Sequence, residues 1–465
     1  MCSREILDKR LRNRWTVFLT RLSARKSFEP DPVSTGVGIG AFLDTCDRCA
    51  FFGSFGMYQN TSIEILAGQR LFSPEELRST TVPVVGQDLP VRADVIIVGG
   101  GIIGLSIAWR LALLGQKVVV VEKARIGSGA SLAATGMLAA AAEYEAGGEI
   151  LIAFALESQR RWETFATELE QGSGMDLDFD KSGTLLVSLT RDETARLRSR
   201  FEMQAKAGLS VQWLSGEAVR ELEGGLRPSV NAGIFCPLDF QIDPRLLIPA
   251  LEKAARGAGV AIIEEASVDS LVMQAGAVDG IISGKRECRA PLVIVTTGAD
   301  AGRRSFLPQS LKIPIRPLRG QSICLRIPER HPPLLQHVIW TEQVHMAQKS
   351  GGRLIVGATV EEAGFNPDVT VGGLFALLEA SRRALPALED IALEAVWSGF
   401  RPTSQDDAPI LGASGVPGLL LAVGHHRNGI LLAPSTADAL VAYALGQDIP
   451  HSAEPLNLQR FGSAS

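Results

Sequence analysis

The segment 94–123 places the strongest constraint on how this chain can fold. It reads DVIIVGGGIIGLSIAWRLALLGQKVVVVEK. The apolar run at 95–98 has the length and β-branched content of a buried parallel strand, and it leads into a GxGxxG sequence at 99–104. A helical stretch follows, and a second apolar run then ends at Glu122. Strand, glycine turn, helix, strand and acidic residue in this order predict a dinucleotide-binding β-α-β unit.

Each part of this unit has a physical role. Gly99 permits the tight turn, Gly101 lets the backbone approach a pyrophosphate, and Gly104 packs the helix against the strand. The start of the helix offers free N–H groups and a positive dipole end to phosphates. Glu122, 18 residues after Gly104, is placed to accept a hydrogen bond from an adenosine ribose. An acid rather than an arginine here favours FAD or NAD over NADP.

The composition is that of a globular enzyme with room for two domains. The chain has 465 residues, of which 46% are hydrophobic and 21% charged. A net charge of −5 gives no reason to expect nucleic acid as a partner. We expect no transmembrane span, because no run of 18 apolar residues occurs. The six scattered cysteines suggest reduced thiols in the cytoplasm, and the lone CxxC at Cys46 and Cys49 is read as a chance pair rather than a zinc site.

The 93 residues before Asp94 do not fit the usual position of such a unit. Residues 1–30 carry eight Lys or Arg against three Asp or Glu. A basic targeting helix, a membrane-surface helix, or an upstream extension with Met57 as the true start are all open. We favour the extension and expect residues 1–91 to be poorly ordered, apart from a short helix at 73–77.

The rest of the chain alternates between two kinds of sheet. A buried run at 291–299 predicts a strand that returns to the dinucleotide sheet, whereas 321–326 and 353–359 predict strands of a separate antiparallel sheet. The strand at 419–423 and the helix at 430–445 enclose a second glycine turn, which suggests another helix start directed at the cofactor. Helices are also predicted at 150–172, 191–207, 243–257 and 373–385.

Small residues dominate the segment 127–142. Such a density of Gly, Ala and Ser indicates close approach of the backbone to a large flat ligand, with tight helix packing as the alternative.

Seven motifs together resemble a known family. They are VGGGIIG at 98–104, Glu122, ATGML at 134–138, RGQ at 319–321, VGAT at 356–359, WSGFRP at 397–402 and GHHRNGIL at 424–431. In this order they resemble the D-amino-acid oxidase family of FAD-dependent oxidoreductases, most closely the glycine oxidases of thiamine biosynthesis. The resemblance covers about residues 92–450, and the Gly-Met-Leu segment and the last two motifs are its most specific parts.

The resemblance implies an activity and a setting. FAD would be bound non-covalently, and hydride would pass from Cα of glycine, sarcosine or a small D-amino acid to flavin N5. The products would be an imine or glyoxylate, ammonia and, with oxygen as acceptor, hydrogen peroxide. The imine would supply the thiazole part of thiamine. A cytoplasmic homotetramer is expected.

The implied fold is α/β, with an FAD-binding Rossmann-like domain of the glutathione-reductase type interwoven with an antiparallel-sheet substrate domain. Residues 1–91 would be the extension. The FAD domain would comprise 92–150, 241–312 and 396–465 with the C-terminal tail, and the substrate domain 151–240 and 313–395.

Two arginines are the candidate substrate ligands. A guanidinium binds a carboxylate bidentately, and Arg401, in an otherwise apolar stretch, is the first choice. Its alternative is an ion pair with Asp406 or Asp407. The resemblance places Arg427 beside substrate and flavin, with a purely structural role as the alternative. His426 is expected to pack at the flavin edge, and no metal site is expected.

The resemblance also implies a cofactor shell. Its members are Gly99, Gly101, Ile102, Ile103, Gly104, Glu122, Lys123, Ala130, Ser131, Thr135, Gly136, Met137, Val268, Thr297, Gly298, His425, His426, Arg427, Asn428, Gly429, Ile430 and Leu431.

One position departs from the family pattern. Where the family has a tyrosine that helps to hold the substrate carboxylate, this chain has His345, followed by Met-Ala-Gln-Lys. A histidine can still donate a hydrogen bond to a carboxylate. The Met-Ala-Gln-Lys run resembles the glycine-oxidising subunits of hydrogen cyanide synthase, which are membrane-associated dehydrogenases. A dehydrogenase that passes electrons to a quinone is therefore the alternative function, and a flavoprotein without turnover is a more remote one.

Overall fold

The computed structural model describes residues 64–66 and 88–462. All of these described residues belong to one compact unit. The predictions for residues 1–30, Met57, the Cys46–Cys49 pair and the helix at 73–77 lie outside the described residues. Within the segment that we expected to be poorly ordered, strand β1 (Glu64–Leu66) pairs in parallel with β18.

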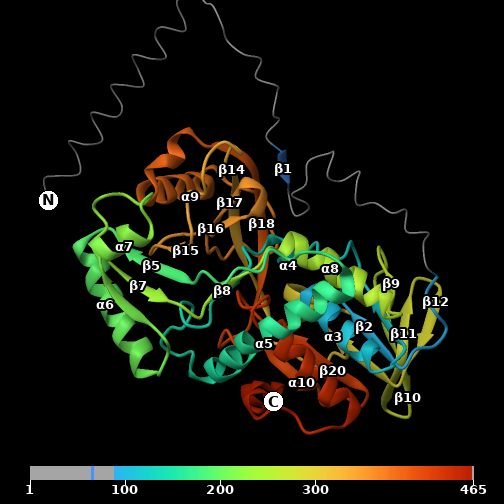
Figure 1. The fold of residues 1–465 in the computed structure, drawn as a ribbon. Helices are drawn as coiled ribbons and strands as arrows, with labels where there is room; N and C mark the ends of the chain where they lie inside the picture. The colour runs from blue at the N-terminus through green and yellow to red at the C-terminus, as the bar shows by residue number, and fades with distance from the viewer. Residues whose placement is uncertain (1–63, 67–87, 463–465) are drawn as a thin grey trace, which may run out of the picture. The chain divides into compact units, whose positions relative to one another are not determined.

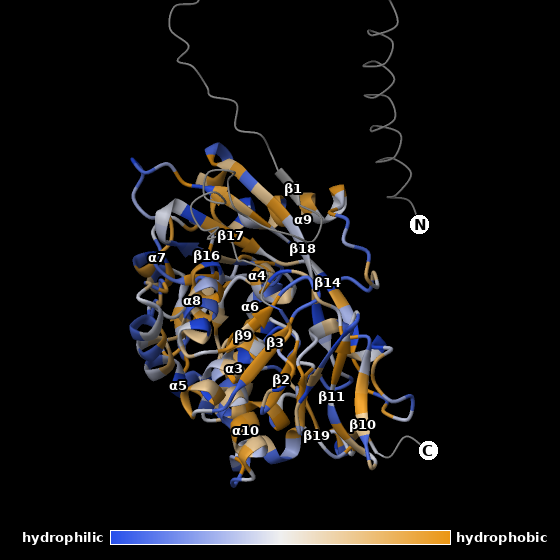
Figure 2. Cartoon of the chain, turned by 90° about the vertical axis from the view of Figure 1, so that its right-hand side faces the viewer, coloured by the Kyte–Doolittle hydropathy of each residue, from blue (hydrophilic) through white to orange (hydrophobic). Residues whose placement is uncertain are grey.

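A six-stranded sheet forms the centre of the half that carries the glycine turn 99–104 (Figure 1). Its order is β19 (Ile410–Ala413), β20 (Leu419–Val423), β13 (Leu292–Val295), β2 (Val95–Val98), β3 (Val118–Val121) and β9 (Ala261–Ile263). Neighbouring strands are parallel, except that β19 runs antiparallel to β20. Figure 2 shows β2, β3 and β9 in orange, as expected for strands buried on both faces.

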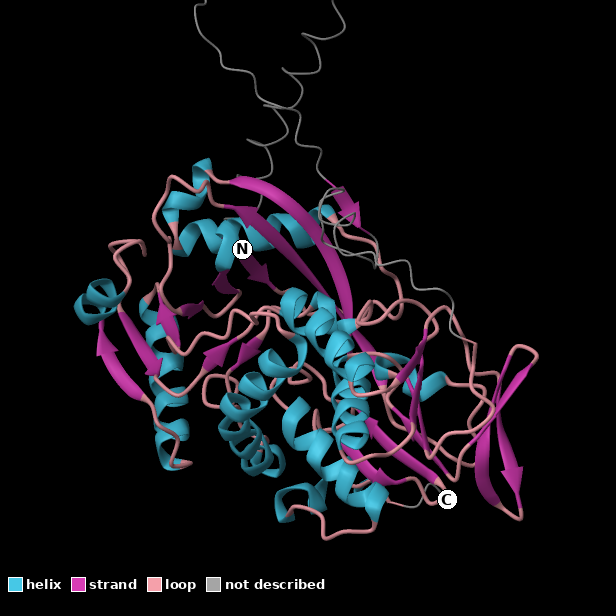
Figure 3. Ribbon diagram, turned by 45° about the vertical axis from the view of Figure 1, so that its right-hand side comes forward, coloured by secondary structure: helices cyan, strands magenta, loops and turns pink. Residues whose placement is uncertain are grey.

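Alternate residues of β2 pack into two different cores. Val95 and Ile97 face the helices α3 (Ile102–Leu113), α5 (Glu149–Ser173), α8 (Pro244–Gly257) and α10 (Ala433–Leu445). Ile96 and Val98 face the opposite side, where a three-stranded sheet of β10 (Ser270–Gln274), β11 (Ala277–Ser283) and β12 (Arg286–Arg289) packs. Figure 3 shows the helices and this small sheet as separate groups.

The second large sheet has nine strands. Its order is β1, β18 (Ala392–Thr403), β14 (Arg316–Arg326), β17 (Arg353–Gly357), β16 (His345–Lys349), β15 (Val338–Trp340), β5 (Thr184–Ser188), β7 (Ala232–Cys236) and β6 (Gln212–Ser215). Helices α6 (Arg191–Lys206), α7 (Gly216–Leu222) and α9 (Val371–Ala384) belong to this half. The short helix α4 (Ala130–Ala133) and the two-stranded pair β4 (Met137–Leu138) and β8 (Phe240–Gln241) connect the halves.

The α/β fold class is confirmed, and the helices predicted within the described residues are present with small shifts. The largest shift concerns α10, which begins at Ala433 rather than Ile430. Residues 425–432 form hydrogen-bonded turns instead, and Pro434 stands in the first turn of the helix, where its missing N–H costs nothing. The division into two interwoven domains stays a prediction, and β18 spans its boundary at 395/396. No helix among the described residues is long and apolar enough to cross a membrane.

The glycine turn packs as closely as the sequence predicts. Gly99 has φ +116°, a left-handed conformation that favours glycine. A Cβ on Gly104 would lie 2.0 Å from the Gly99 carbonyl oxygen and 2.7 Å from Thr296 Oγ1. Helix α3 can therefore start directly behind β2 only because residue 104 has no side chain.

We predict that Gly104→Ala lowers the free energy of unfolding by about 1–3 kcal/mol, because the methyl group has no space. Chemical denaturation would measure the change. Gly257→Ala is the matched control, since an added Cβ there meets no atom within 4 Å. This control should be neutral or slightly stabilising in α8, and equal effects of both substitutions would contradict the packing argument.

Candidate active site

A cavity of about 880 Å³ is lined by residues from both halves. The glycine turn and the ends of β3 and β13 form one part of its wall. Residues of β14, β16 and β18 and the small-residue segment 127–137 form the other part. The cavity therefore brings together motifs that lie up to about three hundred residues apart in the sequence.

The glycine turn is held by Glu122. Its carboxylate accepts hydrogen bonds from the Gly100 N–H at 2.7 Å and the Ala124 N–H at 2.9 Å. Each oxygen retains a second lone pair, so the carboxylate can also accept a bond from a hydroxyl group in the cavity. Glu122 thus connects the end of β3 to the turn before α3.

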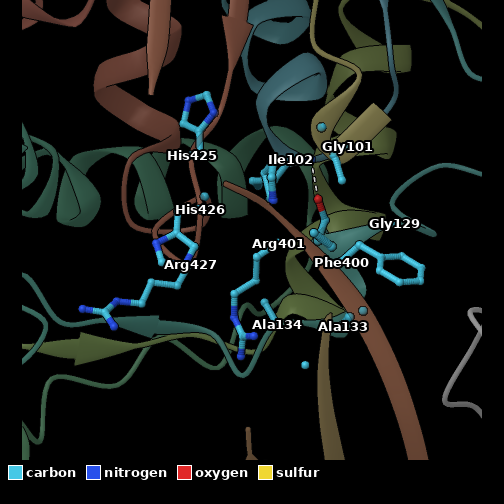
Figure 4. Close-up of a pocket in the computed structure, with 18 of the residues that line it drawn as sticks. Gly101, Ile102, Gly129, Ala133, Ala134, Phe400, Arg401, His425, His426 and Arg427 are labelled. Carbon is cyan, nitrogen blue, oxygen red and sulfur yellow. Dashed lines mark hydrogen bonds between the residues drawn. The ribbon is translucent and has the colours of Figure 1, made fainter. Parts of the chain in front are cut away.

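The start of α3 meets α4 across the cavity wall. Ser131 Oγ accepts a hydrogen bond from the Ile102 N–H at 2.9 Å (Figure 4). A Cβ on Gly101 would meet only this hydroxyl, at 3.1 Å. The first turn of α3 carries no acidic residue. Nearby, the hydroxyl of Thr297 is buried without a hydrogen-bond partner among the described residues. An open backbone, a positive helix end and an unpaired hydroxyl suit a pyrophosphate.

Arg401 projects into the cavity from β18. Its Nη1 donates to the Thr359 carbonyl oxygen at 3.1 Å, and no described carboxylate forms an ion pair with it. The two acids considered as partners are used elsewhere. Asp406 pairs with Arg460 at 2.7 Å, and Asp407 lies 3.6 Å from His426 Nδ1. The ion-pair alternative for Arg401 therefore has no support.

Space for the Arg401 side chain is made by a glycine of the RGQ motif. A Cβ on Gly320 would lie 2.5 Å from Arg401 Nη1. Burial, reinforced by the charge of Arg427, lowers the pKa of Arg401. A guanidinium still keeps its charge at neutral pH, so this cation is available for an anionic ligand.

Arg427 is paired, in contrast to Arg401. Its Nε lies 2.8 Å from Glu143 Oε2, and its Nη2 lies 3.2 Å from Glu145 Oε1. Burial opposes its charge, but these two carboxylates raise the pKa of Arg427. Figure 4 shows that both arginines extend away from His425. Arg427 lines the cavity, yet its charge is already compensated.

His345 stands at the wall of the cavity on β16. Its Nε2 lies 2.7 Å from Thr135 Oγ1, and one of the two groups donates the hydrogen bond. A Cβ on Gly357 would lie 2.6 Å from the same nitrogen. Burial, followed by the charges of Arg401, Arg427 and Lys349, lowers the pKa of His345 to about 3. The ring is therefore neutral at physiological pH.

The other two histidines of the region are also neutral. Burial lowers the pKa of His425 to about 3, and His425 Nε2 lies 3.1 Å from Thr436 Oγ1 in α10. Burial, with Arg427, Arg401 and Arg316, lowers the pKa of His426 to about 3. Among the described residues, no group of His, Cys, Asp and Glu side chains could hold a metal ion.

Most residues of the predicted cofactor shell line this one cavity. The exceptions are Gly104, Asn428 and Leu431. Gly104 packs inside the β2–α3 turn, and the Leu431 carbonyl accepts hydrogen bonds from Ser158 Oγ and Trp162 Nε1 of α5. These roles are structural, and the assignment of the remaining residues to a cofactor stays a prediction.

Comparison with known families identifies the fold and its chemistry. The family model described as "FAD dependent oxidoreductase" (DAO) matches residues 94–443, which is about three quarters of the chain. The chain belongs to this family. This FAD-dependent oxidoreductase would hold its cofactor in the cavity, with the pyrophosphate at the glycine turn and the ribose at Glu122.

Several relatives are similar over most of this oxidoreductase. A protein named glycine oxidase from Geobacillus kaustophilus is 33% identical over 79% of this chain and 97% of its own length. The crystal structure of glycine oxidase from that organism matches with a TM-score of 0.75, 32% identity and coverage of 80% of this chain and 99% of that chain.

The bifunctional protein ThiO/ThiG of Synechocystis is 36% identical over 80% of this chain, but the chain spans only 55% of that protein. The hydrogen cyanide synthase subunit HcnC of Pseudomonas protegens is 29% identical over 80% of this chain and 97% of its own length.

Several residues of the cavity wall were not predicted from the sequence. Glu143, Arg200, Trp340, Phe365 and Phe400 all line it. Glu143 carried a usable signal, because it is the first acidic residue after the run of small residues at 127–142. Arg200, Trp340 and Phe365 come from α6, β15 and a loop, and nothing local in the sequence relates them to the glycine turn. Phe400 lies on β18 within the WSGFRP motif.

We predict that Glu122→Ala weakens FAD binding by about tenfold or more, since it removes the acceptor of two backbone N–H groups. Titration of the apoprotein with FAD, followed by flavin fluorescence, would measure the dissociation constant. Glu122→Gln retains one carbonyl acceptor and should lie between wild type and Glu122→Ala. Unchanged affinity in both variants would contradict this role.

Proposed function

We propose that this FAD-dependent oxidoreductase oxidises glycine, and with it sarcosine or small D-amino acids, with oxygen as the electron acceptor. The observation that carries the proposal is Arg401, a cation that has no carboxylate partner among the described residues and lies in the same cavity as the glycine turn. A relative named glycine oxidase that aligns over nearly its whole length adds support.

In this proposal the substrate carboxylate binds the guanidinium of Arg401. A planar guanidinium can donate two parallel hydrogen bonds to a carboxylate, and this fixes both the position and the rotation of a small amino acid. Bound FAD would supply the hydride acceptor, at flavin N5. The chain itself therefore has to orient Cα and exclude water, which the apolar side chains Phe365 and Phe400 of the cavity wall would do.

His345 is proposed to help to orient the carboxylate where the family has a tyrosine. A neutral imidazole can donate one hydrogen bond, and its pKa of about 3 keeps it neutral across the working range of pH. Its contact with Thr135 connects this ligand to the segment assigned to the flavin. His345 would thus act as a fixed donor rather than as an acid or base.

A second candidate is a glycine or D-amino-acid dehydrogenase that passes electrons to a quinone. It is favoured by His345 with the Met-Ala-Gln-Lys run that follows, and by the similarity to the subunit HcnC. Visible spectra recorded with anaerobic glycine and then with air separate the two. Bleaching that air reverses with release of peroxide supports the oxidase, whereas bleaching that persists in air supports the dehydrogenase.

The wider setting remains part of the proposal. The similarity to ThiO/ThiG supports a supply of imine for the thiazole of thiamine. A cytoplasmic location and a homotetrameric assembly are proposed with it, and cell fractionation and analytical ultracentrifugation test them.

We predict that Arg401→Ala retains FAD but raises the KM for glycine at least tenfold, about 1.4 kcal/mol of lost binding. Steady-state kinetics with a flavin absorbance spectrum would test this. Arg401→Lys should recover only part of the loss, because an ammonium group lacks the bidentate geometry. Arg326→Ala is the control. It removes a partly exposed arginine at the end of β14 that pairs with Glu394 of β18, and it should leave KM unchanged. An unchanged KM in Arg401→Ala would remove Arg401 from the substrate site.

A further inference from the structure

The carboxylate of Glu143 has no role in the mechanism so far. Six acidic residues line the cavity, and Glu143 is the one among them that is buried in the described structure. A buried carboxylate is costly unless its surroundings compensate its charge. Its position in the wall of a ligand cavity therefore calls for an explanation.

The backbone around Glu143 is held rigidly. Asp239 accepts hydrogen bonds from the N–H groups of Ala141 at 3.1 Å and Ala142 at 2.9 Å. From α6, Gln204 Nε2 donates to the Ala141 carbonyl at 2.8 Å, and Arg200 donates to the Ala142 carbonyl. These bonds fix the turn 139–143, so the carboxylate is held in place before any ligand binds.

The charges that face Glu143 come from four places. Arg427 lies 2.8 Å away and Glu145 shares this arginine, while the charges of Asp239 and of Arg200 in α6 also act on Glu143. Burial raises the pKa of Glu143 to about 7, against the opposing effect of Arg427. Near neutral pH the group can therefore both hold and release a proton.

Glu143 and Arg401 influence each other electrostatically. Burial lowers the pKa of Arg401, and the negative charge of Glu143 is one of the effects that oppose this change. The cavity thus contains a cation, Arg401, without a carboxylate partner among the described residues, and the buried carboxylate of Glu143 acts on it electrostatically. A zwitterionic α-amino acid carries charges complementary to these two side chains. Its carboxylate and its ammonium group are both attached to Cα, and they match Arg401 and Glu143 respectively.

We propose that Glu143 binds the substrate amino group and accepts the proton that the ammonium must lose before hydride transfer. This inference rests on the proposed function. In the step, one N–H bond breaks, the proton moves to a carboxylate oxygen of Glu143, and the electron pair stays on nitrogen. That pair then stabilises the iminium product as Cα–H leaves as hydride. The bound FAD of the proposed function would accept this hydride, and no other reactant is needed.

The test is anaerobic flavin reduction by glycine as a function of pH, measured by stopped flow. In wild type, reduction falls as the pH drops below about 7, because Glu143 becomes protonated and can no longer accept a proton. In Glu143→Gln, we expect reduction to be at least about tenfold slower at pH 7. Its rate should rise with pH towards the wild-type value, because free glycine then loses its proton in solution.

Two controls separate this role from a structural one. Glycolate has a carboxylate but no amine, so its binding, followed by the flavin spectrum, should be unchanged in Glu143→Gln. Glu145→Gln removes the other carboxylate on Arg427 and should keep an acidic limb, moved to lower pH because the charge of Glu145 helps to raise the pKa of Glu143. A loss that is equal at all pH values, weaker glycolate binding, or a wild-type profile in Glu143→Gln would each overturn the proposal.

The wild-type profile is an independent test that does not require a folded variant. A wild-type rate without an acidic limb near pH 7 would overturn the role of Glu143 alone. If no small amino acid reduces the flavin of wild type at any pH, the proposed function itself is wrong, and the two failures are thereby distinguished.

Discussion

The close contact between the glycine turn and the end of β13 is the constraint on which the rest of the site depends. Thr296 Oγ1 donates to the carbonyl oxygens of Val98 and Gly99, at 3.1 Å and 2.8 Å, across nearly two hundred residues of sequence. Because Gly99 and Gly104 have no side chains, this contact can form with α3 directly behind it. The start of α3 is thereby aimed into the cavity, and the strand that returns from the other half is anchored beside it.

The two arginines of the cavity show how burial and pairing divide their roles. Arg427 is compensated by Glu143 and Glu145, whereas Arg401 has only carbonyl oxygens as partners among the described residues. A buried cation without a counter-ion is destabilising, and a carboxylate ligand relieves that cost when it binds. The unequal pairing therefore makes Arg401 the stronger candidate for the substrate carboxylate. It leaves the carboxylate of Glu143 as the candidate for the substrate amino group.

Much of the fold could be predicted because its signals are local. The valine-rich strands, the glycine turn and the Asp243 cap of α8, whose side chain accepts the Arg245 N–H, all depend on residues close in sequence. The start of α10 was placed three residues too early, because apolar residues at 430–432 have helical character but are held in turns by their contacts with α5. The pairing of β1 with β18 had no local signal, since it depends on the open edge of a distant strand.

The sequence by itself determined the dinucleotide unit, the order of the motifs and the candidate Arg401, because the turn chemistry and the family resemblance depend on residue identity and spacing. Only the tertiary structure decided which charges meet. Arg427 pairs with Glu143, which is buried, and His345 contacts Thr135. The residues of each pair lie more than two hundred positions apart in the sequence. Glycines at 320 and 357 serve the same end by leaving room for Arg401 and His345. The physical reason is that a pKa, and whether a charged side chain is free to bind a ligand, depend on desolvation and on neighbouring groups in space. Neither can be read from the spacing of residues along the chain.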